Sequence, residues 1–170
     1  MKHHCYTDWS AINNPWPWWR AWVILRNEHC VAKNSWWEKY ATNNQMELQA
    51  VIELLLFYVW ENSRTSSWTG FFEQPIWDTI LIHDMITVFT DSSYVQQWVT
   101  QWLQTWVSRD RRRSRWWKKI ANIAQWKQLH ILIQHFSNLS RKRTKAHVGT
   151  HRNEYVDTQA REQAMSYQRI

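Results

Sequence analysis

The stretch Ile86-Thr87-Val88-Phe89-Thr90-Asp91-Ser92-Ser93-Tyr94-Val95 predicts a buried strand followed directly by a helix. Residues 86–90 are mostly β-branched or aromatic, as in a strand that packs on both faces. Ser92 and Ser93 can cap the helix. Asp91 thus ends the strand, at the edge where open α/β sheets bind ligands. An Asp that only caps the helix is the simpler alternative. The apolar positions of the helix are Val95, Trp98, Val99, Trp102, Leu103 and Trp106.

Length and composition predict one cytoplasmic domain with an anionic partner. A chain of 170 residues is one domain by length, and it is long enough to bury a sizeable core. Its 21 basic and 14 acidic residues give a net charge of +7, which favours a polyanion or an anionic surface. Cys5 and Cys30 form neither a disulfide framework nor a metal-binding spacing. No apolar signal segment is visible, and the longest apolar run, residues 54–60, is too short to span a membrane.

Glycine and tryptophan usage is abnormal. About 12 glycines are expected at an ordinary usage of about 7%. The chain has 2, Gly70 and Gly149, against 16 tryptophans that often stand in pairs. Tight turns require positive φ angles that glycine adopts freely and tryptophan resists. The tryptophans at expected turns therefore conflict with the local structure that the rest of the chain favours.

The order of elements predicts a mixed sheet with helices on its faces. We expect a first strand over residues 3–8 that ends at Asp8, and two more strands in an antiparallel meander, at 22–26 and at 30–33 with 36–40. A helix then follows residues 42–44, with Glu47 in its first turn, where an acid suits the helix dipole. After a surface insertion near 62–75 come the strand and helix around Asp91. A helix over 123–136, a very polar strand over 139–145 and a last helix from 153, with Asp157 one turn in, complete the chain.

Residues 107–119 form a basic and aromatic segment. Such a run is often only a solvated face. Cations interleaved with Trp106, Trp116 and Trp117 also suit nucleic acid, because they pair with phosphates while the rings stack on bases or sugars. The cations are Arg109, Arg111, Arg112, Arg113, Arg115, Lys118 and Lys119.

Four acids, Asp8, Glu47, Asp91 and Asp157, form the candidate catalytic set. Magnesium prefers a few carboxylates together with substrate phosphates. Two such ions about 4 Å apart can activate water and stabilise the leaving oxygen in phosphodiester cleavage. Spacing alone does not show that the four acids converge.

Four segments resemble the bacterial type 1 ribonuclease H family. Residues 7–10 with 14–19, T-D-W-S and N-P-W-P-W-W, resemble T-D-G-S and N-P-G-P-G-G. Residues 42–48, T-N-N-Q-M-E-L, resemble T-N-N-R-M-E-L. Residues 90–95 and 100–102 resemble T-D-S-x-Y-V and T-x-W, and residues 145–157 resemble K-G-H-x-G followed by N-E-x-x-D. The four motifs cover most of the chain in the family's order, and together they are specific.

The resemblance implies a single ribonuclease H-like domain over residues 1–170, with a five-stranded mixed sheet of three antiparallel and then parallel strands. It implies a monomeric endoribonuclease that cleaves the RNA strand of RNA–DNA hybrids with two Mg²⁺ ions, Mn²⁺ being possible, and leaves 5′-phosphate and 3′-hydroxyl ends. Asp8, Glu47, Asp91 and Asp157 match the metal-binding carboxylates, and His147 matches a mobile catalytic histidine. The implied nucleic-acid contacts are Asn14, Thr42, Asn43, Asn44, Trp102 and the basic protrusion 107–119 with Arg111, Arg112, Arg113, Lys118 and Lys119.

The sequence departs from the family mainly at glycines. Trp9, Trp16, Trp18, Trp19 and Trp98 stand at family glycine positions, and Trp36, Trp37 and Trp117 are expected to do the same. Gln45 replaces an Arg, Tyr40 a basic residue, and Ala146 a Gly. Each misplaced indole can cost about 1–3 kcal/mol by overpacking. Two alternatives therefore stay open, a nucleic-acid-binding module without catalysis and an altered, inactive variant.

Overall fold

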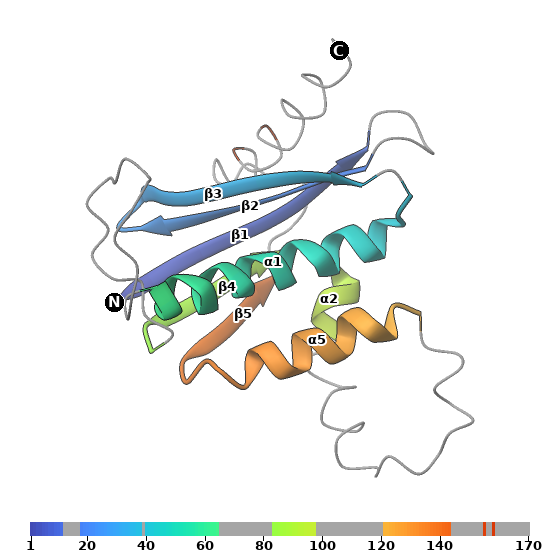
Figure 1. Cartoon of the computed structure of the whole chain (residues 1–170). Coiled ribbons are helices and arrows are strands. Elements are labelled where there is room, and N and C mark those ends of the chain that lie inside the picture. The colour runs from blue at the N-terminus through green and yellow to red at the C-terminus, as the bar shows by residue number, and fades with distance from the viewer. Residues whose placement is uncertain are drawn as a thin grey trace, which may run out of the picture.

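The structure is a computed structural model that describes residues 1–11, 18–38, 40–64, 83–97, 121–143, 155 and 158. An initial meander of three strands is followed, among the described elements, by a helix, a strand, two helices and a last strand (Figure 1). The elements are β1 Lys2–Ala11, β2 Trp18–Arg26, β3 His29–Glu38, α1 Asn43–Arg64, β4 Met85–Thr90, α2 Ser93–Gln97, α5 Ile123–Ile133 and β5 Leu139–Arg143.

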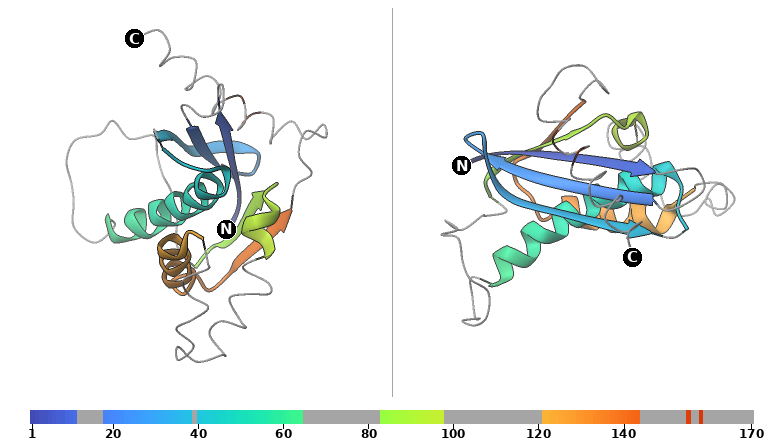
Figure 2. Two further views of the ribbon diagram at one scale, coloured as in Figure 1. Left: turned by 90° about the vertical axis from the view of Figure 1, so that its right-hand side faces the viewer. Right: turned by 90° about the horizontal axis from the view of Figure 1, so that it is seen from above.

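The five strands form one mixed sheet in the order β3-β2-β1-β4-β5. The pairs β1–β2 and β2–β3 are antiparallel, whereas β1–β4 and β4–β5 are parallel. Helices α1 and α5 lie side by side over one face of this sheet (Figures 1 and 2). The predicted fold class, three antiparallel strands followed by parallel ones, is confirmed.

Several predicted boundaries were wrong. β1 continues past Asp8 to Ala11, because its antiparallel pairing with β2 extends to the pair Ala11–Trp18. The third strand, predicted from residues 30–33 and 36–40, starts at His29 and ends at Glu38, where its pairing with β2 ends. α1 starts at Asn43, so Glu47 is its fifth residue and lies just beyond the first turn. α1 also runs to Arg64 and takes up the first residues of the predicted insertion.

The start of α1 is fixed by a capping box. The backbone N–H of Gln45 donates to Thr42 Oγ1 at 3.3 Å, and the backbone N–H of Thr42 donates to Gln45 Oε1 at 2.8 Å. Two N–H groups that no helical bond can satisfy are therefore paired reciprocally. Gln45, which departs from the family motif, thus helps to fix where the helix begins.

The main core lies between α1, α5 and the sheet. Leu48, Ile52 and Leu55 of α1 are buried there with Trp126 and Leu129 of α5. This apolar stripe at helical spacing confirms the amphipathic reading of both helices. Two hydrogen bonds join the helices, because the Gln125 side chain donates to the backbone oxygen of Gln45 at 3.2 Å and to Gln49 Oε1 at 2.8 Å.

The turn from β2 to β3 carries positive φ without glycine. Asn27 and Glu28 have φ angles of 48° and 69°. Two consecutive positive φ values are the requirement of a type I′ hairpin turn, which favours Asn-Gly. Asn adopts positive φ angles readily, whereas the side chain of Glu28 is strained at such an angle and glycine would not be.

The remaining predictions on organisation fall largely outside the described residues. These are the insertion beyond residue 64, the protrusion 107–119, the end of the strand after Arg143, and most of the last helix, of which only Tyr155 and Thr158 are described, both helical. Within the described ranges, no helix combines the length and the apolarity that a membrane crossing requires.

Candidate active site

Asp8 lies on β1, and Asp91 directly follows the adjacent strand β4. In the parallel pair β1–β4, Cys5 lies opposite Val88 and Tyr6 opposite Phe89. Two further residues along this register bring Asp8 level with Asp91, directly after β4. Asp8 is buried and Asp91 half-buried. The two residues are therefore neighbours where β4 ends, although β1 itself continues to Ala11.

The carboxylate of Asp8 accepts a hydrogen bond from the backbone of the next residue. The backbone N–H of Trp9 donates to Asp8 Oδ1 at 2.7 Å. This bond does not depend on the side chain at position 9. It holds a buried carboxylate whose charge would otherwise be costly to desolvate.

Glu47 reaches the same region from α1, which packs on β1 and β2. The indole N–H of Trp9 donates to Glu47 Oε1 at 3.0 Å, and the hydroxyl of Ser92 donates to Oε2. Both oxygens of this carboxylate are therefore engaged by side chains 38 and 45 residues away in the sequence.

The pKa of Glu47 is raised above its ordinary value. Burial is the largest cause, because it disfavours the charged form. The hydrogen bonds from Ser92 and Trp9 act in the opposite direction, and the negative charge of Asp91 raises the pKa further. Glu47 and Asp91 are thus close enough to repel each other.

Ser92 connects three parts of the site. Its hydroxyl oxygen accepts from the backbone N–H of Val95 at 3.1 Å, which caps α2, while the hydroxyl donates to Glu47. Its own backbone N–H donates to Thr90 Oγ1 at 3.2 Å. The sequence predicted the cap. Its contact with Glu47 was missed, because it depends on how α1 packs against the end of β4.

Thr42, Asn43 and Asn44 lie at the exposed start of α1. Thr42 is engaged in the capping box, so a structural role is already assigned to it. The other predicted site residues lie outside the described part of the chain. They are Asn14, Trp102, Arg111, Arg112, Arg113, Lys118, Lys119, His147 and Asp157.

The described carboxylates have the chemistry that a hard divalent cation prefers, but both oxygens of Glu47 already accept hydrogen bonds. Carboxylate oxygens are the ligands that Mg²⁺ prefers, and the repulsion between Glu47 and Asp91 is what a cation would relieve. Among the described residues, however, no three His, Cys, Asp or Glu side chains form a group that could hold a metal ion. Both oxygens of Glu47 are instead hydrogen-bonded, to the indole of Trp9 and to the hydroxyl of Ser92.

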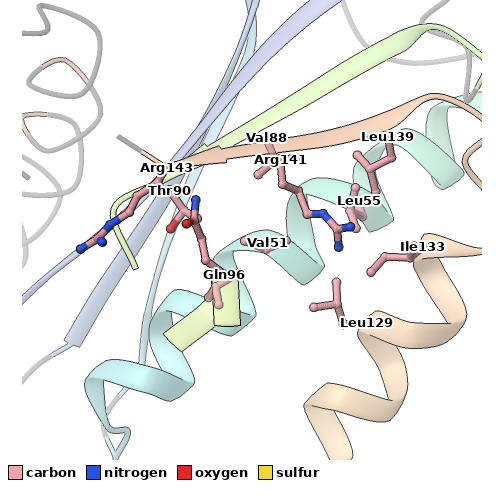
Figure 3. Close-up of a pocket in the computed structure, with 11 residues that line it drawn as sticks. Val51, Leu55, Val88, Thr90, Gln96, Leu129, Ile133, Leu139, Arg141 and Arg143 are labelled. Atoms are coloured by element: carbon pink, nitrogen blue, oxygen red, sulfur yellow. The ribbon is translucent and has the colours of Figure 1, made fainter. Parts of the chain in front are cut away.

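A separate cavity of about 280 Å³ lies between α1, α5 and the strands β4 and β5 (Figure 3). Val51, Leu55 and Leu129 contribute to its apolar wall. Arg141 points into it and Arg143 points away (Figure 3), and burial lowers the pKa of Arg141. The three carboxylates do not line this cavity, so it is distinct from the candidate site.

The strand order and the carboxylates at one sheet edge define a ribonuclease H-like fold. The family model of RNase H matches residues 74–165. Ribonuclease H of Neorickettsia sennetsu is 33% identical over 166 residues, which are 95% of this chain and 92% of that protein. Ribonuclease HI of Campylobacter jejuni is 32% identical over 171 residues, 99% of this chain and 96% of that protein. The chain belongs to the ribonuclease H family.

Solved structures share this fold. RNase H1 from the archaeon Halobacterium salinarum superposes with a TM-score of 0.59 at 20% identity, covering 95% of this chain and 96% of that chain. LC11-RNase H1 in complex with an RNA/DNA hybrid gives a TM-score of 0.58 at 15% identity, covering 96% of this chain and 99% of that chain.

Proposed function

We propose that this protein is an endoribonuclease that hydrolyses the RNA strand of RNA–DNA hybrids. Membership of the ribonuclease H family supports the reaction class. The observation that carries the proposal is the register of β1 and β4, which aligns Asp8 with Asp91 while Glu47 approaches from α1. We assign the metal-binding role to Asp8, Glu47, Asp91 and Asp157, with two Mg²⁺ ions, or Mn²⁺ in their place.

The residues of the chain supply positioning and proton transfer. Bound Mg²⁺ would supply a nucleophilic hydroxide and charge stabilisation at the scissile phosphate. Asp8 is held on β1 and Asp91 directly follows β4, so they require little reorganisation to act as ligands. His147 is assigned to proton transfer near the leaving group. The products are expected to carry 5′-phosphate and 3′-hydroxyl ends.

Hybrid binding is assigned to two surfaces. Asn14, Asn43 and Asn44 would contact the minor groove, where 2′-hydroxyls distinguish the RNA strand. Thr42 and Trp102 would contact the DNA strand together with the basic protrusion 107–119, represented by Arg111, Arg112, Arg113, Lys118 and Lys119. We further propose a single-domain cytoplasmic monomer, without a membrane partner.

Cleavage of a labelled hybrid tests the proposal. We expect turnover with Mg²⁺ or Mn²⁺ and none with EDTA. Asp91→Asn should abolish turnover but leave hybrid binding largely intact, because it removes a charge and keeps the side-chain size. Glu38→Gln, at the exposed end of β3, is the matched control and should cleave normally. Equal cleavage with and without EDTA would rule out the metal mechanism.

A binding module without catalysis is the second candidate. It is favoured by the net charge of +7 and by the engagement of both Glu47 oxygens. It predicts salt-sensitive hybrid binding and no cleavage with any divalent ion. An altered, inactive ribonuclease H would also lack cleavage, and it would in addition lack a cooperative thermal melt. Turnover that disappears in Asp91→Asn would reject both.

A further inference from the structure

We propose that the indole of Trp9 is a negative determinant of divalent-cation binding, because it withholds Glu47 from the metal site. The inference rests on the proposed function insofar as Glu47 is taken as a ligand. It concerns the side chain at position 9, where the ribonuclease H motif carries glycine.

The geometry supplies the mechanism. Trp9 follows Asp8 directly on β1, so its half-buried indole stands at the sheet edge with the carboxylates. Its N–H donates to Glu47 Oε1 at 3.0 Å. The hydroxyl of Ser92 donates a hydrogen bond to the other carboxylate oxygen, Oε2. A cation that binds Glu47 must displace one of these donors or share its oxygen with it.

Replacing a hydrogen-bond donor of Glu47 by a cation is unfavourable for two reasons. A hydrogen bond to a charged group is stronger than a neutral one, and here it is partly shielded from water. The ring also fills space that water molecules of a hydrated Mg²⁺ would need, and Mg²⁺ usually keeps several of its waters. Glycine at this position would remove the donor and the bulk together.

The backbone hydrogen bond from Trp9 to Asp8 is independent of the indole. The N–H of Trp9 that donates to Asp8 Oδ1 belongs to the main chain. It is kept in every variant at position 9 except proline. Changes in cation affinity on substitution at this position therefore report on the indole, through Glu47, and not on the bond to Asp8.

Two substitutions separate the hydrogen bond from the bulk. Trp9→Phe keeps an aromatic ring and removes the N–H, whereas Trp9→Gly removes both. Trp36→Phe is the matched control, because Trp36 is an exposed aromatic residue on β3, outside the contacts of Glu47. Thermal melts of each variant establish that the fold is kept.

Mn²⁺ binding is measured from the electron paramagnetic resonance signal of the free ion, and Mg²⁺ by competition. We expect Trp9→Phe to tighten Mn²⁺ binding by about tenfold, or about 1.4 kcal/mol, and Trp9→Gly to tighten it further. Adding Glu47→Gln should cancel the gain, and Trp36→Phe should leave the affinity unchanged. If Trp9→Gly fails to fold, Trp9→Phe decides the question alone.

An affinity of Trp9→Phe that stays within about twofold of the parent, or a gain that survives Glu47→Gln, would overturn the inference. Failure of the proposed function looks different. In that case no variant cleaves the hybrid, whatever its Mn²⁺ affinity. If only the present inference fails, metal-dependent cleavage persists while Trp9→Phe and the parent bind Mn²⁺ alike.

Discussion

Arg20 on β2 donates two hydrogen bonds to one carboxylate oxygen of Glu53 on α1, from Nε at 2.9 Å and from Nη2 at 2.5 Å. Both side chains are largely buried, with exposed fractions of 9% and 17%. The Gln49 side chain adds a longer bond to the same oxygen. This ion pair ties the helix that carries Glu47 to the antiparallel half of the sheet.

Breaking this pair on one side should destabilise the fold. Arg20→Met leaves the Glu53 charge uncompensated in a partly buried place, and we expect a loss of about 2–4 kcal/mol in the free energy of unfolding. Urea denaturation measures it. Glu38→Gln, at an exposed position of β3, should change stability by less than about 0.5 kcal/mol. A cost for Arg20→Met as small as that of the control would contradict a structural role for the pair.

Ser92→Ala should remove the cap of α2 and the hydrogen bond to Glu47 together, because one hydroxyl makes both contacts. Loss of the N-cap oxygen should lower the free energy of unfolding by about 1 kcal/mol. Ser92→Thr keeps the hydroxyl and should recover most of that loss. Chemical denaturation of the three proteins is the measurement, and equal stability of all three would show that the cap contributes nothing.

Glu28→Gly should stabilise the protein. Glu28 has a φ of 69°, where a side chain clashes and glycine does not. The substitution creates Asn-Gly, the preferred pair of a type I′ turn. We expect a gain of about 1 kcal/mol, reduced somewhat by the greater freedom of glycine in the unfolded chain. A lower melting temperature for Glu28→Gly would show that the turn is not strained.

Stability should decrease as the solution becomes acidic because of His3. This residue is fully buried, and its ring nitrogen Nδ1 lies 2.9 Å from the hydroxyl of Tyr58. Burial is the main cause that lowers its pKa below 6.5. Asp84 opposes the shift, while Arg26 and the chain's amino group add to it.

The sign follows from proton uptake. Below pH 6.5 the unfolded chain protonates His3 more readily than the folded chain does, so the free energy of unfolding should fall as the pH drops from 6.5 towards the lowered pKa. His3→Asn removes this titration and should flatten the pH dependence over that window. Denaturation curves at several pH values measure it, and parallel profiles for the two proteins would contradict the assignment.

The tryptophans at family glycine positions form a systematic set. Trp9, Trp16, Trp18, Trp19 and Trp98 each stand where the family carries Gly, in a chain that retains only 2 glycines. The sequence therefore differs from the family at these positions in one consistent direction, from the smallest side chain to the largest.

The sequence by itself determined the elements and the candidate chemistry. The β-branched run before Asp91, the helical stripe from Met46 and the capping residue Thr42 are local signals, because neighbouring residues decide strand and helix formation over short distances. The motif order was enough to predict the strand arrangement of the family. Pairing lengths were less predictable, because the partner strand decides where β1 ends, as its extension to Ala11 shows.

Only the tertiary structure decided how Asp8, Glu47 and Asp91 are arranged. The alignment of Asp8 with Asp91 depends on the parallel register between strands more than 80 residues apart in the chain. The engagement of Glu47 by Trp9 and Ser92 depends on how α1 packs over the sheet. These contacts carry no local sequence signal, because they arise when burial of the apolar faces of α1 and the sheet brings distant side chains within hydrogen-bonding distance.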